Sequence, residues 1–123
     1  MFPIELYTQT SKQSSKQSIR ALVVALPADK DDMQSSSILD AQEITKTLRK
    51  RNPNGYVKLL LNREVDSKNF WKWFDEILLK GDENHVRLLF IASHGDKSGF
   101  YPYSFDGKEL ILWTQINEKL KLK

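Results

Sequence analysis

The chain has 123 residues, of which 40% are hydrophobic and 28% are charged, a composition typical of one globular domain with a substantial core. It has no cysteine, which excludes disulfides, thiolate metal sites and thiol nucleophiles. The net charge is +3, but most cations are interleaved with acids and no recognition motif accompanies them, so we expect no nucleic-acid partner.

The N-terminal residues 1–18 are predicted to be a flexible segment that precedes the domain at 19–123. Residues 1–6 are weakly apolar and are compatible with a short edge strand or with a partner contact. From Thr8 to Ser18 the chain contains only Gln, Ser, Thr and Lys, the composition of a linker. Neither a secretory signal nor an apolar run long enough to cross a bilayer is present. We therefore expect a cytoplasmic protein without a membrane partner.

The first buried strand is predicted at residues 21–26, an unbroken apolar run closed by Pro27. A polar stretch with three nearby aspartates follows at residues 28–36, and we interpret it as a solvated loop, because it lacks the spacing of a calcium loop. Residues 37–40 have the form of a capping box. They predict a helix with Ala41, Ile44 and Leu48 on one face and three cations in its last turn, at 49–51.

A second strand is predicted at residues 56–61 and a third at residues 86–92. Between them, Asp66 or Ser67 can cap a helix that ends at Gly81. The apolar face of that helix consists of Phe70, Phe74, Ile77 and Leu78, and Trp71 and Trp73 flank it as core-covering residues. This alternation of strands and helices predicts a mostly parallel sheet with right-handed crossovers, flanked by helices.

The pattern changes after the third strand. Aromatic and small residues alternate from Gly99 to Phe105, Asp106-Gly107 is a hairpin signal, and an apolar run answers it at residues 110–112. A small hairpin is therefore predicted, followed by a helix at residues 113–120.

His94 and Gly95 come directly after the third strand, at the end of a parallel strand where ligands and chemistry collect in α/β sheets. An imidazole there can act as a general base, whereas the alternative is a loop histidine bonded to its own turn. Ser93 and Ser98 lie nearby but lack the context of a nucleophile elbow. His85, at the other end of the strand, is interpreted as a solvated loop residue. We predict no metal site and no cofactor, since only His94 and Asp96 are close in sequence.

The order of elements, with Ser93-His94-Gly95 after an apolar strand and a later Asp106-Gly107 hairpin, resembles the caspase-like fold of caspases, metacaspases and paracaspases. The resemblance extends from about Ile19 to Leu120 and implies a three-layer caspase-like sandwich. It implies that His94 is the general acid/base and that the backbone N–H of Gly95 contributes to an oxyanion hole. The family's nucleophile is a cysteine at the end of the following strand.

The chain departs from that pattern because it lacks cysteine and ends at Lys123, before a fourth long strand. Substrate-binding residues are not assigned, although Arg20 is near the region expected for the family's basic pocket residues. We therefore predict a caspase-like, cysteine-peptidase-related domain that is inactive alone and acts as part of a caspase-like protease, or as its regulator. A partner or a second copy is expected to complete the sheet beside the third strand. The alternative is a small α/β protein-interaction domain unrelated to proteases.

Overall fold

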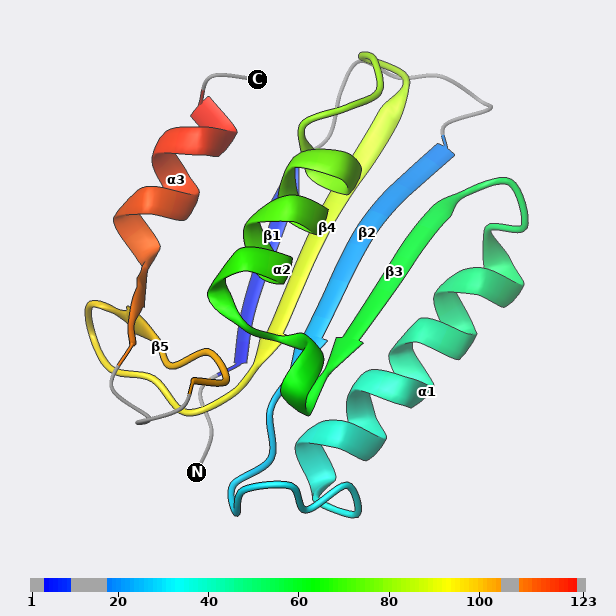
Figure 1. Cartoon of the computed structure of the whole chain (residues 1–123). Coiled ribbons are helices and arrows are strands. Elements are labelled where there is room, and N and C mark those ends of the chain that lie inside the picture. Colours follow the sequence, from blue (N-terminus) through cyan, green and yellow to red (C-terminus); the bar gives the residue numbers. More distant parts are fainter. Residues whose placement is uncertain (1–3, 10–17, 105–108, 122–123) are drawn as a thin grey trace.

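The computed structural model describes residues 18–104 and 109–121, together with the backbone of residues 4–9. Its main sheet has the strand order β1-β4-β2-β3, in which β1 comprises Ile4–Gln9 (Figure 1). The strands β2 (Ser18–Ala25), β3 (Tyr56–Leu61) and β4 (His85–Ala92) are parallel to one another. The parallel sheet predicted from the three apolar runs is therefore confirmed.

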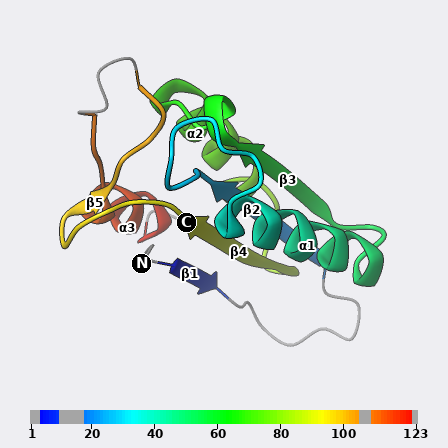
Figure 2. The same cartoon turned by 90° about the horizontal axis from the view of Figure 1, so that it is seen from below.

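Helices cover both faces of this sheet, as the view from below shows (Figure 2). The helix α1 (Ser36–Arg51) connects β2 to β3. The helix α2 (Ser67–Trp73) continues into the π-helical turn η2 (Phe74–Leu78) and lies on the opposite face. A 3-10 turn, η1 (Asn62–Glu64), precedes α2. No helix within the described residues combines the length and apolar character needed to cross a bilayer.

Two apolar cores result because successive strand residues point to opposite faces of the sheet. On the α1 side, Val23 and Ala25 of β2 pack with Ile38 and Ala41 of α1. The larger core is on the α2 side and is formed by Leu22, Val24, Leu26, Leu60, Val65, Phe70, Phe74, Ile77, Leu78, Leu89, Ile91, Phe100, Ile111 and Ile116. The predicted apolar face of α2 is thus confirmed, and Trp71 and Trp73 pack against this core as expected.

The start of α1 differs from the prediction. The N-cap residue is Ser35, whose side chain makes no capping hydrogen bond, so the capping box predicted at residues 37–40 is wrong. The Ser37 hydroxyl instead donates to the carbonyl oxygen of Leu26 at 2.9 Å. A buried serine at this position ties the helix to the end of β2, which a local sequence pattern does not reveal. At α2 the Asp66 carboxylate accepts from the N–H of Asn69 at 2.7 Å, as a cap should.

The position beside β4 is occupied by the chain itself. The strand β1 (Ile4–Gln9) runs antiparallel to β4, from the pair Ile4 and Ala92 to the pair Gln9 and Arg87. The open edge expected beside the third strand is therefore wrong for this structure. Of the two alternatives for residues 1–6, the edge strand is the one that the structure contains.

Two buried arginines hold the end of the α2–η2 segment against the sheet. Arg20 and Arg87 are neighbours in the register of β2 and β4, and they are only 8% and 6% exposed. Arg20 donates to the carbonyl oxygens of Ile77 and Glu76 at 2.8 and 3.0 Å. Arg87 donates to Leu78 at 2.9 Å, and also to the carbonyls of Lys80 and Asp82. Burial, with the nearby Arg20 guanidinium, lowers the pKa of Arg87.

The segment after β4 forms a small hairpin and a helix on the α2 side (Figure 2). The strands β5 (Gly99–Phe100) and β6 (Ile111–Leu112) pair antiparallel, and α3 (Trp113–Lys121) follows directly. The expected hairpin and helix are present, whereas the predicted Asp106-Gly107 turn lies outside the described residues. Gly99 is required here, because a Cβ at this position would lie 1.9 Å from the carbonyl oxygen of Ile111.

Candidate functional site

His94 lies just beyond β4, which is an inner strand of the sheet between β1 and β2. Its side chain is exposed, while its backbone is held in place by neighbouring groups. The carbonyl oxygen of His94 accepts hydrogen bonds from the Tyr101 N–H and from the Ser93 hydroxyl, both at 3.0 Å. The predicted position at the end of a central parallel strand is thus what the structure shows.

Gly95 pairs with Phe100 in an isolated antiparallel bridge. The two hydrogen bonds of this bridge are donated by the N–H groups of Tyr101 and Asp96, at 3.0 and 2.9 Å. In such a pair, the N–H of the middle residue points away from its partner. The Gly95 N–H is therefore not used by the bridge.

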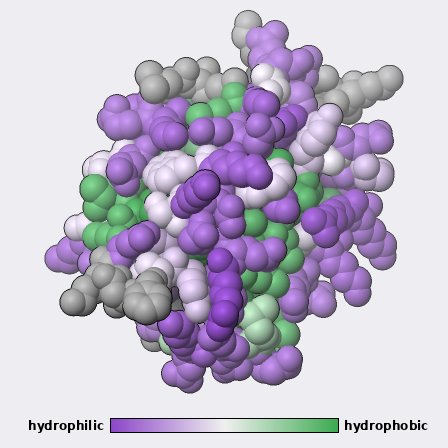
Figure 3. Space-filling view, viewed as in Figure 1, coloured by the Kyte–Doolittle hydropathy of each residue, from purple (hydrophilic) through white to green (hydrophobic). Residues whose placement is uncertain are grey.

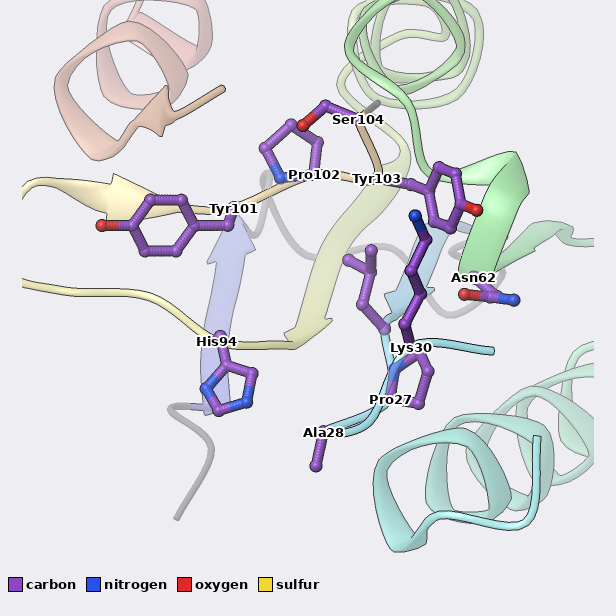
Figure 4. Close-up of a pocket in the computed structure, with 10 residues that line it drawn as sticks. Pro27, Ala28, Lys30, Asn62, His94, Tyr101, Pro102, Tyr103 and Ser104 are labelled. Carbon is purple, nitrogen blue, oxygen red and sulfur yellow. The ribbon is translucent and has the colours of Figure 1, made fainter. Parts of the chain in front are cut away.

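A cleft of about 340 Å³ opens beside the His94 side chain, at the carboxyl ends of the parallel strands. Its walls come from the loop after β2, the residue after β3, His94 after β4 and the segment that follows β5 (Figure 4). The lining residues are Leu26, Pro27, Ala28, Lys30, Asn62, His94, Tyr101, Pro102, Tyr103 and Ser104. Most of this lining is apolar or aromatic, with a few polar groups, as in a typical ligand site.

One wall of the cleft is fixed by contacts to Asp31. The Asp31 carboxylate accepts from the Asn62 amide at 2.8 Å and from the Arg63 guanidinium at 3.0 Å. These bonds, that of Arg63 foremost, lower the pKa of Asp31 to about 2. Both Asp31 and Asn62 have positive φ angles, 65° and 53°, a conformation that non-glycine residues rarely adopt. The Asp31–Asn62–Arg63 contact thus fastens the loop after β2 to the loop after β3.

Two cations lie near the Tyr103 ring, at the wall of the cleft that contains Asn62. The Lys30 ammonium lies 5.2 Å from the centre of the Tyr103 ring, and the Arg63 guanidinium lies 5.7 Å from it. Lys30, Asn62 and Tyr103 were missed at the sequence level, because they belong to three separate loops. The signal that could have indicated Lys30 is its place in a polar run directly after a buried strand, a run that the sequence pattern predicts to be a solvated loop.

The serines near His94 do not form a nucleophile site. The Ser93 hydroxyl is fully buried and is directed to the carbonyl of the next residue. Ser98 is exposed and does not line the cleft. Ser104 does line it, but Tyr101 and Pro102 separate it from the His94 ring in Figure 4. Since the sequence contains no cysteine, the imidazole has no thiol of this chain to activate.

Asp96, two residues after His94, makes its side-chain hydrogen bonds within its own loop. Its carboxylate accepts from the N–H groups of Ser98 and Gly99 and from the Tyr101 hydroxyl, the last at 3.2 Å. These bonds, led by that of Ser98, lower the pKa of Asp96. Within the described part of the chain, no three His, Asp or Glu side chains converge as metal ligands would.

Arg20 and His85 lie at the opposite end of the sheet from His94. Arg20 points toward the end of η2 and does not line the cleft beside His94. His85 is the first residue of β4 rather than a solvated loop residue, and its Nδ1 lies 3.0 Å from the Asp82 carboxylate. Both residues are therefore structural in this arrangement.

Comparisons with protein-family models, with curated proteins and with solved structures found no match for this chain.

Proposed function

We propose that this chain is a caspase-like, cysteine-peptidase-related domain that binds a peptide beside His94 without cleaving it. It would then act as a part or as a regulatory partner of a caspase-like protease. The three-layer sandwich and a cytoplasmic location belong to the same proposal. The observation that carries it is the position of His94 at the wall of the 340 Å³ cleft, directly after an inner parallel strand.

Two features support the family assignment. The Ser93-His94-Gly95 sequence directly follows β4, where the family's general base would be placed, and the Gly95 N–H is not used by the bridge to Phe100. A backbone N–H beside an imidazole is the arrangement that stabilises an oxyanion during acyl transfer. With a peptide carbonyl in the cleft, the same N–H can bind the ground-state oxygen.

The absence of cysteine supports binding without hydrolysis. In the family, the next parallel strand supplies the nucleophile, but here the neighbour of β4 on that side is β1, which is antiparallel. Loss of the nucleophile costs several orders of magnitude in rate even where the rest of a catalytic unit is intact.

The placement of β1 also favours the second candidate, a self-contained protein-interaction domain with no protease relationship. The strand pairs with β4 along residues 4–9 and supplies the neighbour that a protease half would require from elsewhere. In that case the cleft is a recognition site and His94 serves only as one of its polar groups.

A peptide panel with Asp, Arg or Lys at the position before a fluorogenic group tests the proposal. We expect binding without turnover, and binding should be weakened at least about tenfold by His94→Ala, since His94 lines the cleft. The matched control is His85→Ala, which removes the chain's other histidine at the far end of β4 and should leave binding unchanged.

Turnover that disappears in His94→Ala would contradict the absence of hydrolysis. Equal loss of peptide binding in His85→Ala and His94→Ala, or no binding by any peptide in the panel, would contradict peptide recognition at the cleft.

A further inference from the structure

Positive charge is concentrated in one part of the chain. Residues 44–61 contain five Lys or Arg residues and no Asp or Glu. Since the whole chain carries only +3, the remainder is net acidic. In the structure these residues form the second half of α1 and the strand β3, which meet at one margin of the sheet. Hydrophilic residues dominate the side of the molecule where α1 lies in Figure 3.

The strand β3 is the outermost strand at this margin, and its outer backbone groups are only partly occupied. The Val57 carbonyl accepts from the Arg49 guanidinium at 3.1 Å. The Leu61 N–H donates to the Glu64 carboxylate at 3.0 Å. Because strand residues alternate in direction, Leu59, midway between them, also turns its N–H and C=O outward. A strand edge of this kind is a template for pairing with another chain.

Cations flank this edge on both faces of the sheet. On the α1 side, Lys46 and Arg49 are exposed, as are the last two residues of the helix, Lys50 and Arg51. On the α2 side, the Lys58 ammonium lies 4.2 Å from the centre of the Trp73 ring. The ion pairs among the described residues involve other cations. The positive charge at this edge is therefore available to a partner.

We propose that β3 is a docking edge that accepts an extended acidic segment of another protein as a further strand. Backbone pairing with Val57 and Leu59 supplies the contact. Adjacent carboxylates of the segment point to opposite faces of the sheet, so one reaches the cations of α1 and the next reaches Lys58. A carboxylate that binds Arg49 also frees the Val57 carbonyl, which then accepts from the backbone of the incoming strand. The Glu64 carboxylate occupies the Leu61 N–H and repels an acidic segment, because both are negatively charged. The paired region therefore ends before Leu61.

An acidic polypeptide fits this edge better than a nucleic acid does. The outward N–H and C=O groups of Leu59 require an alternating backbone partner, which a phosphate chain does not provide. The aromatic rings near this edge already contact cations, which compete with base stacking. Lys58 and Lys72 lie 4.2 and 5.2 Å from the centre of the Trp73 ring. The Arg20 guanidinium lies 4.3 Å from the centre of the Tyr56 ring.

The probe for this proposal is a short labelled peptide in which pairs of glutamates alternate with pairs of valines, so that both faces of the strand carry carboxylates. Its binding is measured by fluorescence anisotropy with the full chain. We expect binding that protects the amides of Val57 and Leu59 from hydrogen exchange. Arg49→Glu and Lys58→Glu should each weaken binding about fivefold, since each replaces an attraction between exposed charges with a repulsion. The matched control, Lys121→Glu at the exposed end of α3, should change it less than about twofold.

Peptides with N-methylated backbone amides distinguish pairing as an added strand from attraction between charges alone. N-methyl groups on the edge of the peptide that pairs with β3 should abolish binding, whereas N-methyl groups on its other edge should not. Binding that tolerates both, or that leaves the Leu59 amide unprotected, would overturn the proposal. Displacement of the peptide by an oligodeoxythymidylate of equal charge would assign the edge to nucleic acid instead. His94→Ala should not affect this binding, because the cleft is a separate site.

Discussion

Replacing Arg87 by methionine tests whether the buried arginines hold the α2–η2 segment on the sheet. Arg87 is 6% exposed and donates to the carbonyl oxygens of Leu78, Lys80 and Asp82 at 2.9, 3.1 and 3.3 Å. Methionine matches the aliphatic part of the side chain but leaves the Leu78 and Lys80 carbonyls without this donor. The Asp82 carbonyl still accepts from the His85 N–H at 3.2 Å. Each buried acceptor left unsatisfied costs about 1–3 kcal/mol.

The expected loss in the free energy of unfolding is smaller than the sum of these costs for the separate acceptors. Water reaches the outer carbonyls once the guanidinium is gone, and the repulsion between Arg87 and Arg20 is removed. We therefore expect Arg87→Met to lower the free energy of unfolding by about 3 kcal/mol, a large fraction of the ~5–15 kcal/mol typical of a domain. Arg87→Lys should recover at most about 1 kcal/mol, because one ammonium cannot reproduce the planar fork.

Urea unfolding followed by tryptophan fluorescence measures these values, with the slope checked for constancy. The matched control is Arg49→Met, since the exposed Arg49 also donates to a carbonyl, that of Val57, at 3.1 Å. It should cost less than about 0.5 kcal/mol. Equal losses at the two positions, or full recovery by Arg87→Lys, would refute the argument from buried acceptors.

Two further predictions concern the loops around the cleft and the hairpin. The pKa of Asp31 is lowered from 3.8 to about 2, so its stabilising effect is complete above about pH 4 and is lost as the pH falls through about 2. The difference in urea midpoint between the native chain and Asp31→Asn should therefore shrink over that range; a constant difference would argue against the ion pair, and Asp29→Asn is the control. Gly99→Ala should cost more than about 2 kcal/mol by calorimetry, because its Cβ would meet the backbone of Ile111. The neighbouring Ser98→Ala should be nearly neutral, and similar values for the two variants would contradict this account.

Much of the fold could be predicted because its signals are local. The apolar runs ending near Ala25, Leu61 and Ala92 became the three parallel strands, and the spacing of Phe70 and Phe74 identified the buried face of α2. The position of His94 followed from the same reasoning, since it depends only on where one strand ends.

The remainder depends on contacts between distant residues. Ser37 bonds to Leu26 rather than to its own helix, and no local pattern distinguishes a capping serine from one recruited by a strand. Asp31 and Asn62, both at positive φ, are 31 residues apart in sequence and are joined by a side-chain hydrogen bond that no local pattern predicts. The cleft beside His94 requires Tyr101 to fold back over the end of β4, which becomes visible only in three dimensions.

The pairing of β1 with β4 has a consequence for biosynthesis. Ile4 leaves the ribosome long before its partner Ala92 is made, so the first strand of the sheet to be synthesised cannot pair until β4 emerges. Contacts at such large sequence separation slow folding, because the entropy of closing a long loop is lost before any stabilising contact forms. Before β4 emerges, only β2 and β3 of the main sheet, with α1 between them, can associate. Residues 4–9 therefore stay unpaired for most of the synthesis of the domain.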